Sequence, residues 1–320
     1  MTDITEHPVQ VPEPSARLRG VIPPVCTPLT LDREVDKASM EKLITFLIEG
    51  GVSGLFVLGS TSEAAFLRDD QRDAVVEVAV ATAAGQVPVI AGAIDMTTSR
   101  MIDHGRRAVS LGADAIVATA PFYVRTDHRV EHAIHFRALK SELEVPIIAY
   151  DIPIAVNRKL APDLILELAM DGTVSALKDS SGDLGALREV LLGRGQAPGF
   201  SVFTGSEILV DCIMLMGADG AVPGLANVDP HGFVKVVNLC DDDQWLVARA
   251  EQDRLVRLFD ITTCANPSNK GPSSSGLGGF KTALMLLGVI STNAVALPQV
   301  PLDVDEIAKV KAVLVDVGLM

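Results

Sequence analysis

Residues 145–152, VPIIAYDI, decide the fold of this 320-residue chain. The run is almost continuously apolar, is rich in isoleucine, and reaches polar side chains only at Tyr150 and Asp151. Strands that are covered on both faces have this composition, whereas strands with one face in water alternate apolar and polar residues. The stretch therefore predicts a parallel strand that is buried on both sides.

Seven further runs of the same kind occur along the chain, at residues 20–28, 54–60, 87–94, 115–123, 174–181, 200–206 and 220–226. Amphipathic, helix-like segments lie between them, and several end in glycine, as helices often do. Eight such strands, each followed by a helix, predict an α/β fold, a (β/α)8 TIM barrel spanning residues 19–240. The alternative is a doubly wound open sheet, but no G-x-G-x-x-G turn follows the first strand.

The two ends of the chain differ from the barrel pattern. Residues 1–18 are polar and proline-rich without the apolar core of a signal peptide, so we expect a flexible tail. Residues 241–320 contain helical patterns at 243–261, 278–290 and 302–318, with a Ser/Gly/Pro-rich loop predicted at 264–278. We expect them to form a C-terminal helical extension packed on the barrel.

Composition limits the partners and the compartment. The net charge of −14 repels polyanions, so neither nucleic acid nor an anionic membrane is an expected partner. No apolar run reaches the roughly 18 residues that a membrane span needs. The four cysteines are widely spaced and form no CxxC pair, which predicts buried free thiols and a cytoplasmic location.

Reacting groups of such barrels lie where the strands end, and Lys178 lies near the end of the sixth run. Alternation along the strand directs Lys178 inward and Asp179 to the opposite side. Burial without a partner lowers the pKa of an amine and leaves a neutral nucleophile that attacks carbonyl groups. The competing interpretation is a lysine that reaches solvent or forms an ion pair.

Other strand ends also carry polar groups. In GSTSEA, residues 59–64, the hydroxyls of Ser60 and Thr61 could cradle a carboxylate, or could cap the next helix with Glu63 completing a capping box. The only two tyrosines, Tyr123 and Tyr150, both fall at strand ends. Glycines near the last two strand ends could admit a phosphate, but no basic residue accompanies them.

Three histidines invite a metal-site interpretation. His128, His132 and His135 are spaced to share one helix face. That helix lies outside the predicted barrel, and solvated or packed side chains are the better interpretation. We expect no metal.

Five motifs together resemble the dihydrodipicolinate synthase/N-acetylneuraminate lyase (DapA) family of class I pyruvate aldolases. They are GSTSEA, YDIP at 150–153, ALKDSSGD at 176–183, TGSE at 204–207 and GADGAVPGLAN at 217–227. The similarity runs from about Arg19 to the C-terminus. It implies a lyase without cofactor or metal that forms a lysine imine with pyruvate or another 2-oxo acid, and a homotetramer built as a dimer of dimers.

The resemblance also implies roles for single residues. Lys178 matches the imine-forming lysine, Tyr150 the tyrosine that moves protons beside it, and Ser60 a member of the proton relay. Tyr123 matches a tyrosine that reaches the neighbouring subunit's site. The substrate-binding positions are Gly59, Thr61, Ala155, Gly205 and Val222.

Two departures from the family pattern bear on the substrate. Ser62 replaces the second glycine of G-x-T-G-E, which costs about 1 kcal/mol if the turn requires positive φ there. Ala155 stands where the synthases carry an arginine that binds the second substrate's carboxylate. The pattern favours an aldolase, lyase or dehydratase of 2-keto-3-deoxy sugar acids. The alternatives are 4-hydroxy-tetrahydrodipicolinate synthase acting on aspartate semialdehyde, with Arg158 as substitute cation, and a non-catalytic 2-oxo-acid-binding barrel.

Overall fold

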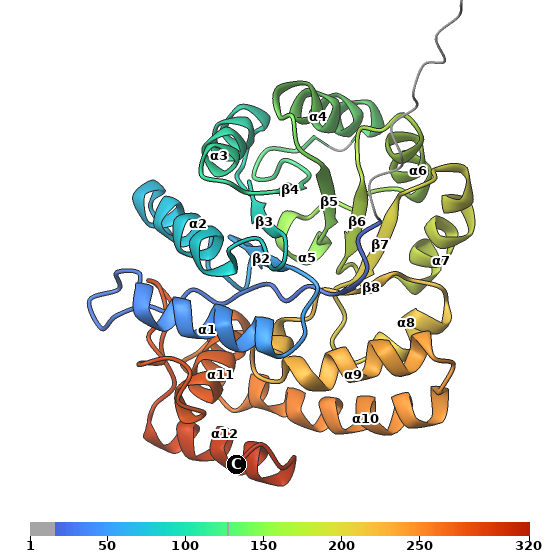
Figure 1. Cartoon of the computed structure of the whole chain (residues 1–320). Coiled ribbons are helices and arrows are strands. Elements are labelled where there is room, and N and C mark those ends of the chain that lie inside the picture. The colour runs from blue at the N-terminus through green and yellow to red at the C-terminus, as the bar shows by residue number, and fades with distance from the viewer. Residues whose placement is uncertain (1–16, 127) are drawn as a thin grey trace, which may run out of the picture.

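The computed structural model describes residues 17–126 and 128–320 and shows eight parallel strands enclosed by helices (Figure 1). The strands are β1 Gly20–Val21, β2 Leu55–Val57, β3 Val89–Gly92, β4 Ala115–Thr119, β5 Ile147–Asp151, β6 Ala176–Asp179, β7 Ser201–Thr204 and β8 Gly220–Ala221. β1 pairs with β8, and a parallel bridge between Pro24 and Phe56 closes the ring beside β2. The predicted TIM barrel is confirmed, and the open sheet is wrong. The predicted tail falls mostly on residues 1–16, outside the described residues.

Helices alternate with the strands and form the outer layer (Figure 1). They are α1 Lys37–Glu49, α2 Asp69–Ala83, α3 Thr98–Ser110, α4 Arg129–Glu142, α5 Pro153–Val156, α6 Pro162–Met170, α7 Leu184–Gly193, α8 Val210–Leu215 and α9 Pro230–Asp241. Local sequence sets their ends. The Asp183 carboxylate, for example, accepts the Ala186 amide at the start of α7.

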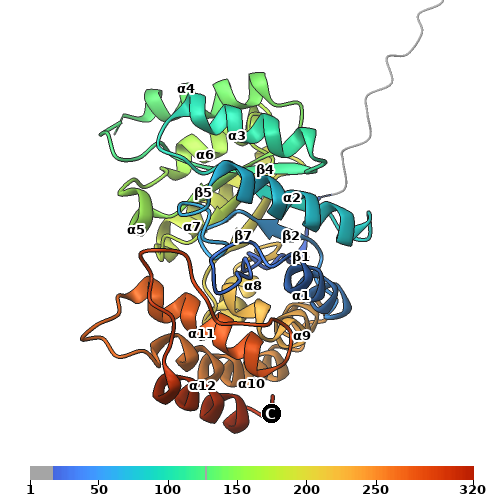
Figure 2. The same ribbon diagram turned by 90° about the vertical axis from the view of Figure 1, so that its left-hand side faces the viewer.

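Three further helices, α10 Trp245–Leu258, α11 Pro272–Leu286 and α12 Val304–Asp316, gather with α9 beside the barrel (Figure 2). The loop predicted at 264–278 is wrong in its second half, because α11 begins at Pro272. Proline suits the first turn of a helix, and the burial of Leu277 compensates for the weak helix propensity of the surrounding serines and glycines. A side chain at Gly279 would meet the Ile261 carbonyl oxygen at 2.3 Å, so only glycine fits this contact.

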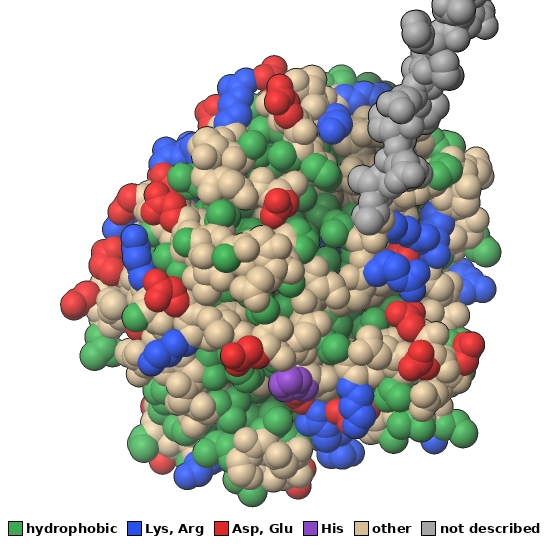
Figure 3. Space-filling view, viewed as in Figure 1, with side chains coloured by type: hydrophobic (Ala, Val, Ile, Leu, Met, Phe, Trp, Pro, Cys, Tyr) green, Lys and Arg blue, Asp and Glu red, His purple; other side chains and the backbone are tan. Residues whose placement is uncertain are grey.

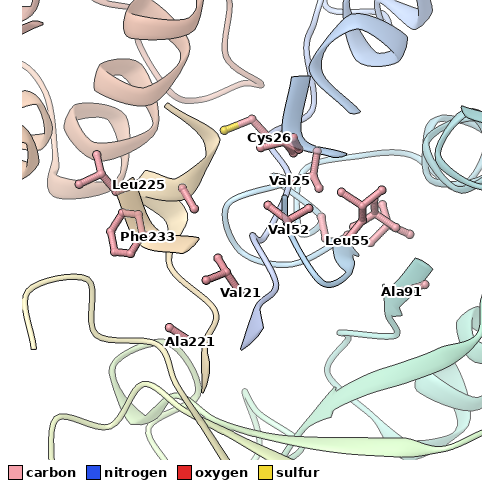
Figure 4. Close-up of a cluster of buried hydrophobic side chains, with 14 of the residues drawn as sticks. Val21, Val25, Cys26, Val52, Leu55, Ala91, Ala221, Leu225 and Phe233 are labelled. Atoms are coloured by element: carbon pink, nitrogen blue, oxygen red, sulfur yellow. The ribbon is translucent and has the colours of Figure 1, made fainter. Parts of the chain in front are cut away.

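Apolar side chains form two layers of core. The larger lies between strands and helices and includes Val21, Leu55 and, from α9, Phe233, which lies next to Leu225 (Figure 4). The smaller fills the barrel interior with Ile22, Phe56 and other inward residues. The polar groups at the strand ends lie next to this inner layer.

The surface is charged and mixed. On the face drawn in Figure 3, acidic and basic side chains are interspersed. Within the described residues, no helix is long and apolar enough to cross a membrane. Cys26, Cys240 and Cys264 are buried as predicted, but Cys212 is exposed because it lies on the outer side of the short helix α8.

Candidate active site

Lys178 and Tyr150 stand side by side at the centre of the site. They are paired directly in the register of β5 and β6. Both side chains are buried, and the lysine Nζ lies 4.2 Å from the centroid of the Tyr150 ring and 4.9 Å from that of Phe56. The Tyr150 and Phe56 rings meet edge to face at 6.3 Å. The strand pairing thus brings an amine and a phenol together in an apolar enclosure.

Asp179 faces away from this pair. Its Oδ1 accepts hydrogen bonds from the amide and the hydroxyl of Ser181, each at 2.8 Å. The alternation expected for the strand therefore holds, and Lys178 is not simply paired with its sequence neighbour.

The turn after β2 does not cap a helix. α2 begins at Asp69 and is preceded by Arg68, so Ser60 and Thr61 lie well before it, and the capping interpretation is wrong. Ser60 is exposed and Thr61 half-buried, and their amide hydrogens have no acceptor among the described residues. Two hydroxyls and two amides are thus available to an anionic group beside Gly59.

Ser62 is not strained. The left-handed residues of this segment are Leu58 and Glu63, with φ of 57° and 60°. The Ser62 hydroxyl is buried and donates to the Val25 carbonyl oxygen at 2.5 Å, while the Thr27 hydroxyl donates to the Ser62 carbonyl at 2.8 Å. The expected cost of replacing glycine is therefore absent, and serine adds a link to the segment after β1.

Glu63 joins this turn to the C-terminal helices. It forms an ion pair with Lys281 of α11, and both side chains are fully buried. The second Glu63 oxygen accepts the Ala296 amide at 2.6 Å, and Lys281 donates to the Ala294 carbonyl at 2.8 Å. Sequence reasoning missed this pair because its partners are more than 200 residues apart.

The ends of β7 and β8 complete the rim. The Gly205 amide donates to the Asp179 carbonyl at 2.7 Å, and a side chain at Gly205 would collide with Ser180. Val222 lines the same small hollow inside the barrel as Lys178. Gly205 directly follows β7 and Val222 directly follows β8, so both lie at strand ends, as the sequence predicts.

Glu207 is a further candidate that sequence reasoning missed. Its Oε1 accepts the Gly224 amide at 3.0 Å, and burial raises its pKa, opposed by that hydrogen bond and by the charge of Lys178. It lines a pocket of about 740 Å³ whose wall includes Thr262, Ser275 and Phe280. The motif TGSE contained the residue, but nothing in the local pattern indicated the pocket, which α11 helps to form.

Tyr123 lies apart from this group. It is 89% exposed, with φ of 75°, in the loop after β4. Ala155 lines a second pocket, of about 220 Å³, together with Ser60, Thr119 and Phe122. Arg158 is half-buried, and its Nη1 donates to the Asn157 carbonyl at 2.5 Å. Within one chain, the structure does not bring Tyr123 to Lys178.

The three histidines have separate surroundings. His135 is buried between the Thr119 carbonyl at 3.0 Å and the Thr98 hydroxyl at 2.9 Å, and burial lowers its pKa to about 4. His132 contacts the Thr126 carbonyl at 2.8 Å, while His128 is exposed at the start of α4. No group of three metal-binding side chains occurs in the described part of the chain.

Comparisons with known proteins identify the family. The sequence model of the Dihydrodipicolinate synthetase family matches residues 17–316. A 4-hydroxy-tetrahydrodipicolinate synthase of Salinibacter ruber is 33% identical over 287 residues, 89% of this chain and 90% of the relative. An uncharacterized DapA-like lyase of Halobacterium salinarum is 30% identical over 98% of this chain and 100% of its own length.

Solved structures show the same likeness. YagE, a prophage protein of E. coli K12 from the dihydrodipicolinic acid synthase family, solved in complex with pyruvate, superposes with a TM-score of 0.87 at 27% identity, over 94% of this chain and 99% of YagE. Dihydrodipicolinate synthase of Bacteroides thetaiotaomicron has a TM-score of 0.88 at 31% identity, over 93% and 98% of the two chains. The chain therefore belongs to the dihydrodipicolinate synthetase family of Schiff-base-forming class I lyases.

Proposed function

We propose that the protein makes or breaks a carbon–carbon or carbon–oxygen bond of a 2-oxo acid such as pyruvate through an imine on Lys178. The observation that carries the proposal is the Tyr150–Lys178 pair, which places a phenol beside a buried amine. An amine can attack a carbonyl carbon, and a phenol beside it can donate or accept a proton.

The proposed chemistry assigns a task to each group. The Lys178 amine attacks the keto carbon, and the carbinolamine loses water as Tyr150 supplies a proton to the leaving hydroxyl. The resulting iminium accepts the electron pair that is released when C3 loses a proton or when the C3–C4 bond breaks. Ser60 relays the proton, and the Gly59–Thr61 turn holds the carboxylate, a role that the open amides of Ser60 and Thr61 support.

The remainder of the substrate is proposed to be the polyhydroxylated tail of a 2-keto-3-deoxy sugar acid. Glu207 and the hydroxyls of Thr262 and Ser275 line the 740 Å³ pocket and suit hydroxyl groups. The Lys270 amine on the same wall is 3.0 Å from the Glu306 carboxylate. Because Lys270 is already paired with Glu306, this pocket gives little support to a substrate that carries a second carboxylate.

Trapping of the imine tests the proposal. Incubation with pyruvate and borohydride, followed by intact-mass measurement, should yield one covalent adduct. Borohydride reduces the imine to a secondary amine, which does not hydrolyse. Lys178→Ala should yield none, and Tyr150→Phe should form the adduct about 10²–10⁴-fold more slowly, since its proton transfer is lost. An adduct that survives Lys178→Ala would reject the assignment, as would the absence of any wild-type adduct.

The second candidate is 4-hydroxy-tetrahydrodipicolinate synthase, which the Salinibacter ruber relative favours by its name. Condensation with aspartate semialdehyde would need a side chain that donates hydrogen bonds to the carboxylate of this substrate, and the alanine at position 155 cannot do so. Turnover of pyruvate with aspartate semialdehyde, compared with cleavage of a panel of 2-keto-3-deoxy acids, separates the candidates. A higher specific rate with aspartate semialdehyde would favour the synthase.

A further inference from the structure

We infer that Lys159 is a positioning residue for the imine chemistry, because it joins the strand ends that carry Tyr150 and Lys178 and balances two buried carboxylates behind them. The inference rests on the proposed role of Lys178. It adds a residue outside the predicted site, eight positions beyond Asp151 in the segment that follows α5.

Lys159 bridges β5 and β6. Its Nζ forms an ion pair and hydrogen bond with Asp151 Oδ2, donates to the Leu160 carbonyl at 3.2 Å, and lies 3.9 Å from Asp179 Oδ2. Asp151 and Asp179 are only 1% and 5% exposed, and the strand register pairs them directly. The Lys159 ammonium group therefore lies near the carboxylates of both Asp151, the last residue of β5, and Asp179, the last residue of β6.

The carboxylates and the reacting pair occupy successive positions. Tyr150 pairs with Lys178, and the next register step pairs Asp151 with Asp179. Because successive side chains of a strand point to opposite faces, the reacting pair faces the barrel interior while the two aspartates face outward. A shift of either strand end at the aspartates would also move Tyr150 or Lys178.

Each aspartate has further donors that fix its place. Asp151 Oδ1 accepts the Leu160 amide at 3.1 Å, and Asp179 Oδ1 accepts from Ser181. Burial raises the pKa of Asp151, although the hydrogen bonds from Lys159 and Leu160 oppose that rise. The cluster thus holds two carboxylates against one ammonium group, so its charge depends directly on Lys159.

Removing that ammonium changes the field at Lys178. The titratable groups around the Lys178 amine are Tyr150 on β5, Glu207 beyond β7, and the two aspartates behind the strands. With Lys159 absent, uncompensated negative charge favours the ammonium form of Lys178. Imine formation needs the neutral amine of Lys178. The pH at which imine formation reaches half of its maximal rate should therefore rise.

The test is the pH dependence of pyruvate trapping by borohydride in full-length variants, measured by intact mass. The midpoint is the pH at which the trapping rate is half of its maximum. We expect Lys159→Met to raise this midpoint by about 0.5–1 pH unit, which slows trapping roughly three- to tenfold at pH values below the midpoint. Lys159→Arg keeps the charge and should retain the wild-type midpoint. Asp151→Asn removes a negative charge at nearly constant shape and should lower the midpoint.

The outcomes separate this inference from the proposed function. If the wild-type protein forms no adduct, the imine itself is rejected and the role of Lys159 with it. If the wild-type protein forms an adduct but the midpoints of Lys159→Met and Asp151→Asn are unchanged, only the inference is rejected. Should Lys159→Met fail to fold, Asp151→Asn decides alone, and an unchanged or raised midpoint overturns the inference.

Discussion

At the scale of single residues, the turn that follows β2 depends on which residue takes the left-handed conformation. Glu63 takes it, and its neighbour Ser62 does not. Ser62 instead uses its hydroxyl to hold the Val25 carbonyl, so the turn is fixed by a buried hydrogen bond. A residue that departs from the family's glycine thereby gains a structural role.

Ser62→Gly should destabilise the protein by about 1.5–2 kcal/mol. The change removes one buried hydrogen bond, worth roughly 1 kcal/mol, and adds backbone freedom worth roughly 0.5–1 kcal/mol to the unfolded chain. Urea unfolding measures the loss. Ser62→Ala is the matched control because it removes the hydroxyl alone and should show only the first part. A glycine variant more stable than wild type would mean that the turn is strained after all.

Sequence reasoning reached Lys178, Tyr150 and the β2 turn because alternation and strand ends are local properties. It overlooked Glu207, Lys159 and Lys281, since their importance lies in contacts with other segments. Lys159 illustrates the difference: it follows the YDIP motif closely, yet its contact with Asp179 depends on the register between β5 and β6. The local pattern identifies the proposed reacting groups, whereas the contacts that hold them are visible only in the tertiary structure.

At the scale of elements, α11 is tied to the turn after β2, which belongs to the candidate active site. Its buried Lys281 reaches Glu63, and the segment that follows it supplies the Ala296 amide to the same carboxylate. The strands were predictable because burial on both faces gives continuous apolar runs. The start of α11 was not, because PSSSGLGG is a weak helix former whose conformation depends on packing against η3, Phe259–Thr263.

Lys281→Met should lower the free energy of unfolding by about 3–5 kcal/mol, because it leaves the Glu63 carboxylate buried without its cation. Since Glu63 belongs to the turn proposed to bind the substrate carboxylate, the variant should also need more pyruvate for half-maximal trapping. Urea unfolding and the pyruvate dependence of borohydride trapping measure the two effects.

The double variant Glu63→Gln/Lys281→Met is the control for this pair. It removes both charges, so it should lose less stability than the two single changes added together. Additive losses would mean that the ion pair contributes no coupling, and an unchanged pyruvate requirement in Lys281→Met would separate the pair from the site.

At the scale of the whole molecule, the exposed apolar side chains at the rim bear on assembly. Tyr123, Val124 and Ile154 are 89%, 66% and 90% exposed beside the 220 Å³ pocket lined by Ser60 and Ala155. Water contact of such side chains is unfavourable, and a second copy of the chain would cover them. We therefore propose the homotetramer, a dimer of dimers in which Tyr123 enters the neighbouring subunit's pocket.

A complementation experiment tests whether the site is shared. Lys178→Ala removes the imine-forming residue, and Tyr123→Phe removes the hydroxyl proposed to serve the neighbour. In a mixed dimer, the Tyr123→Phe subunit keeps Lys178 and receives an intact Tyr123 from its partner, so one complete site is restored.

Co-expressed subunits with different affinity tags, purified in tandem, should form the pyruvate adduct at a rate approaching one wild-type site per mixed pair. A rate no higher than the mean of the two parent variants would place Tyr123 outside the shared site, whatever the oligomeric state measured by sedimentation. Since both parents contain every other residue of the site, recovery in the mixed pair can arise only from groups that cross the interface.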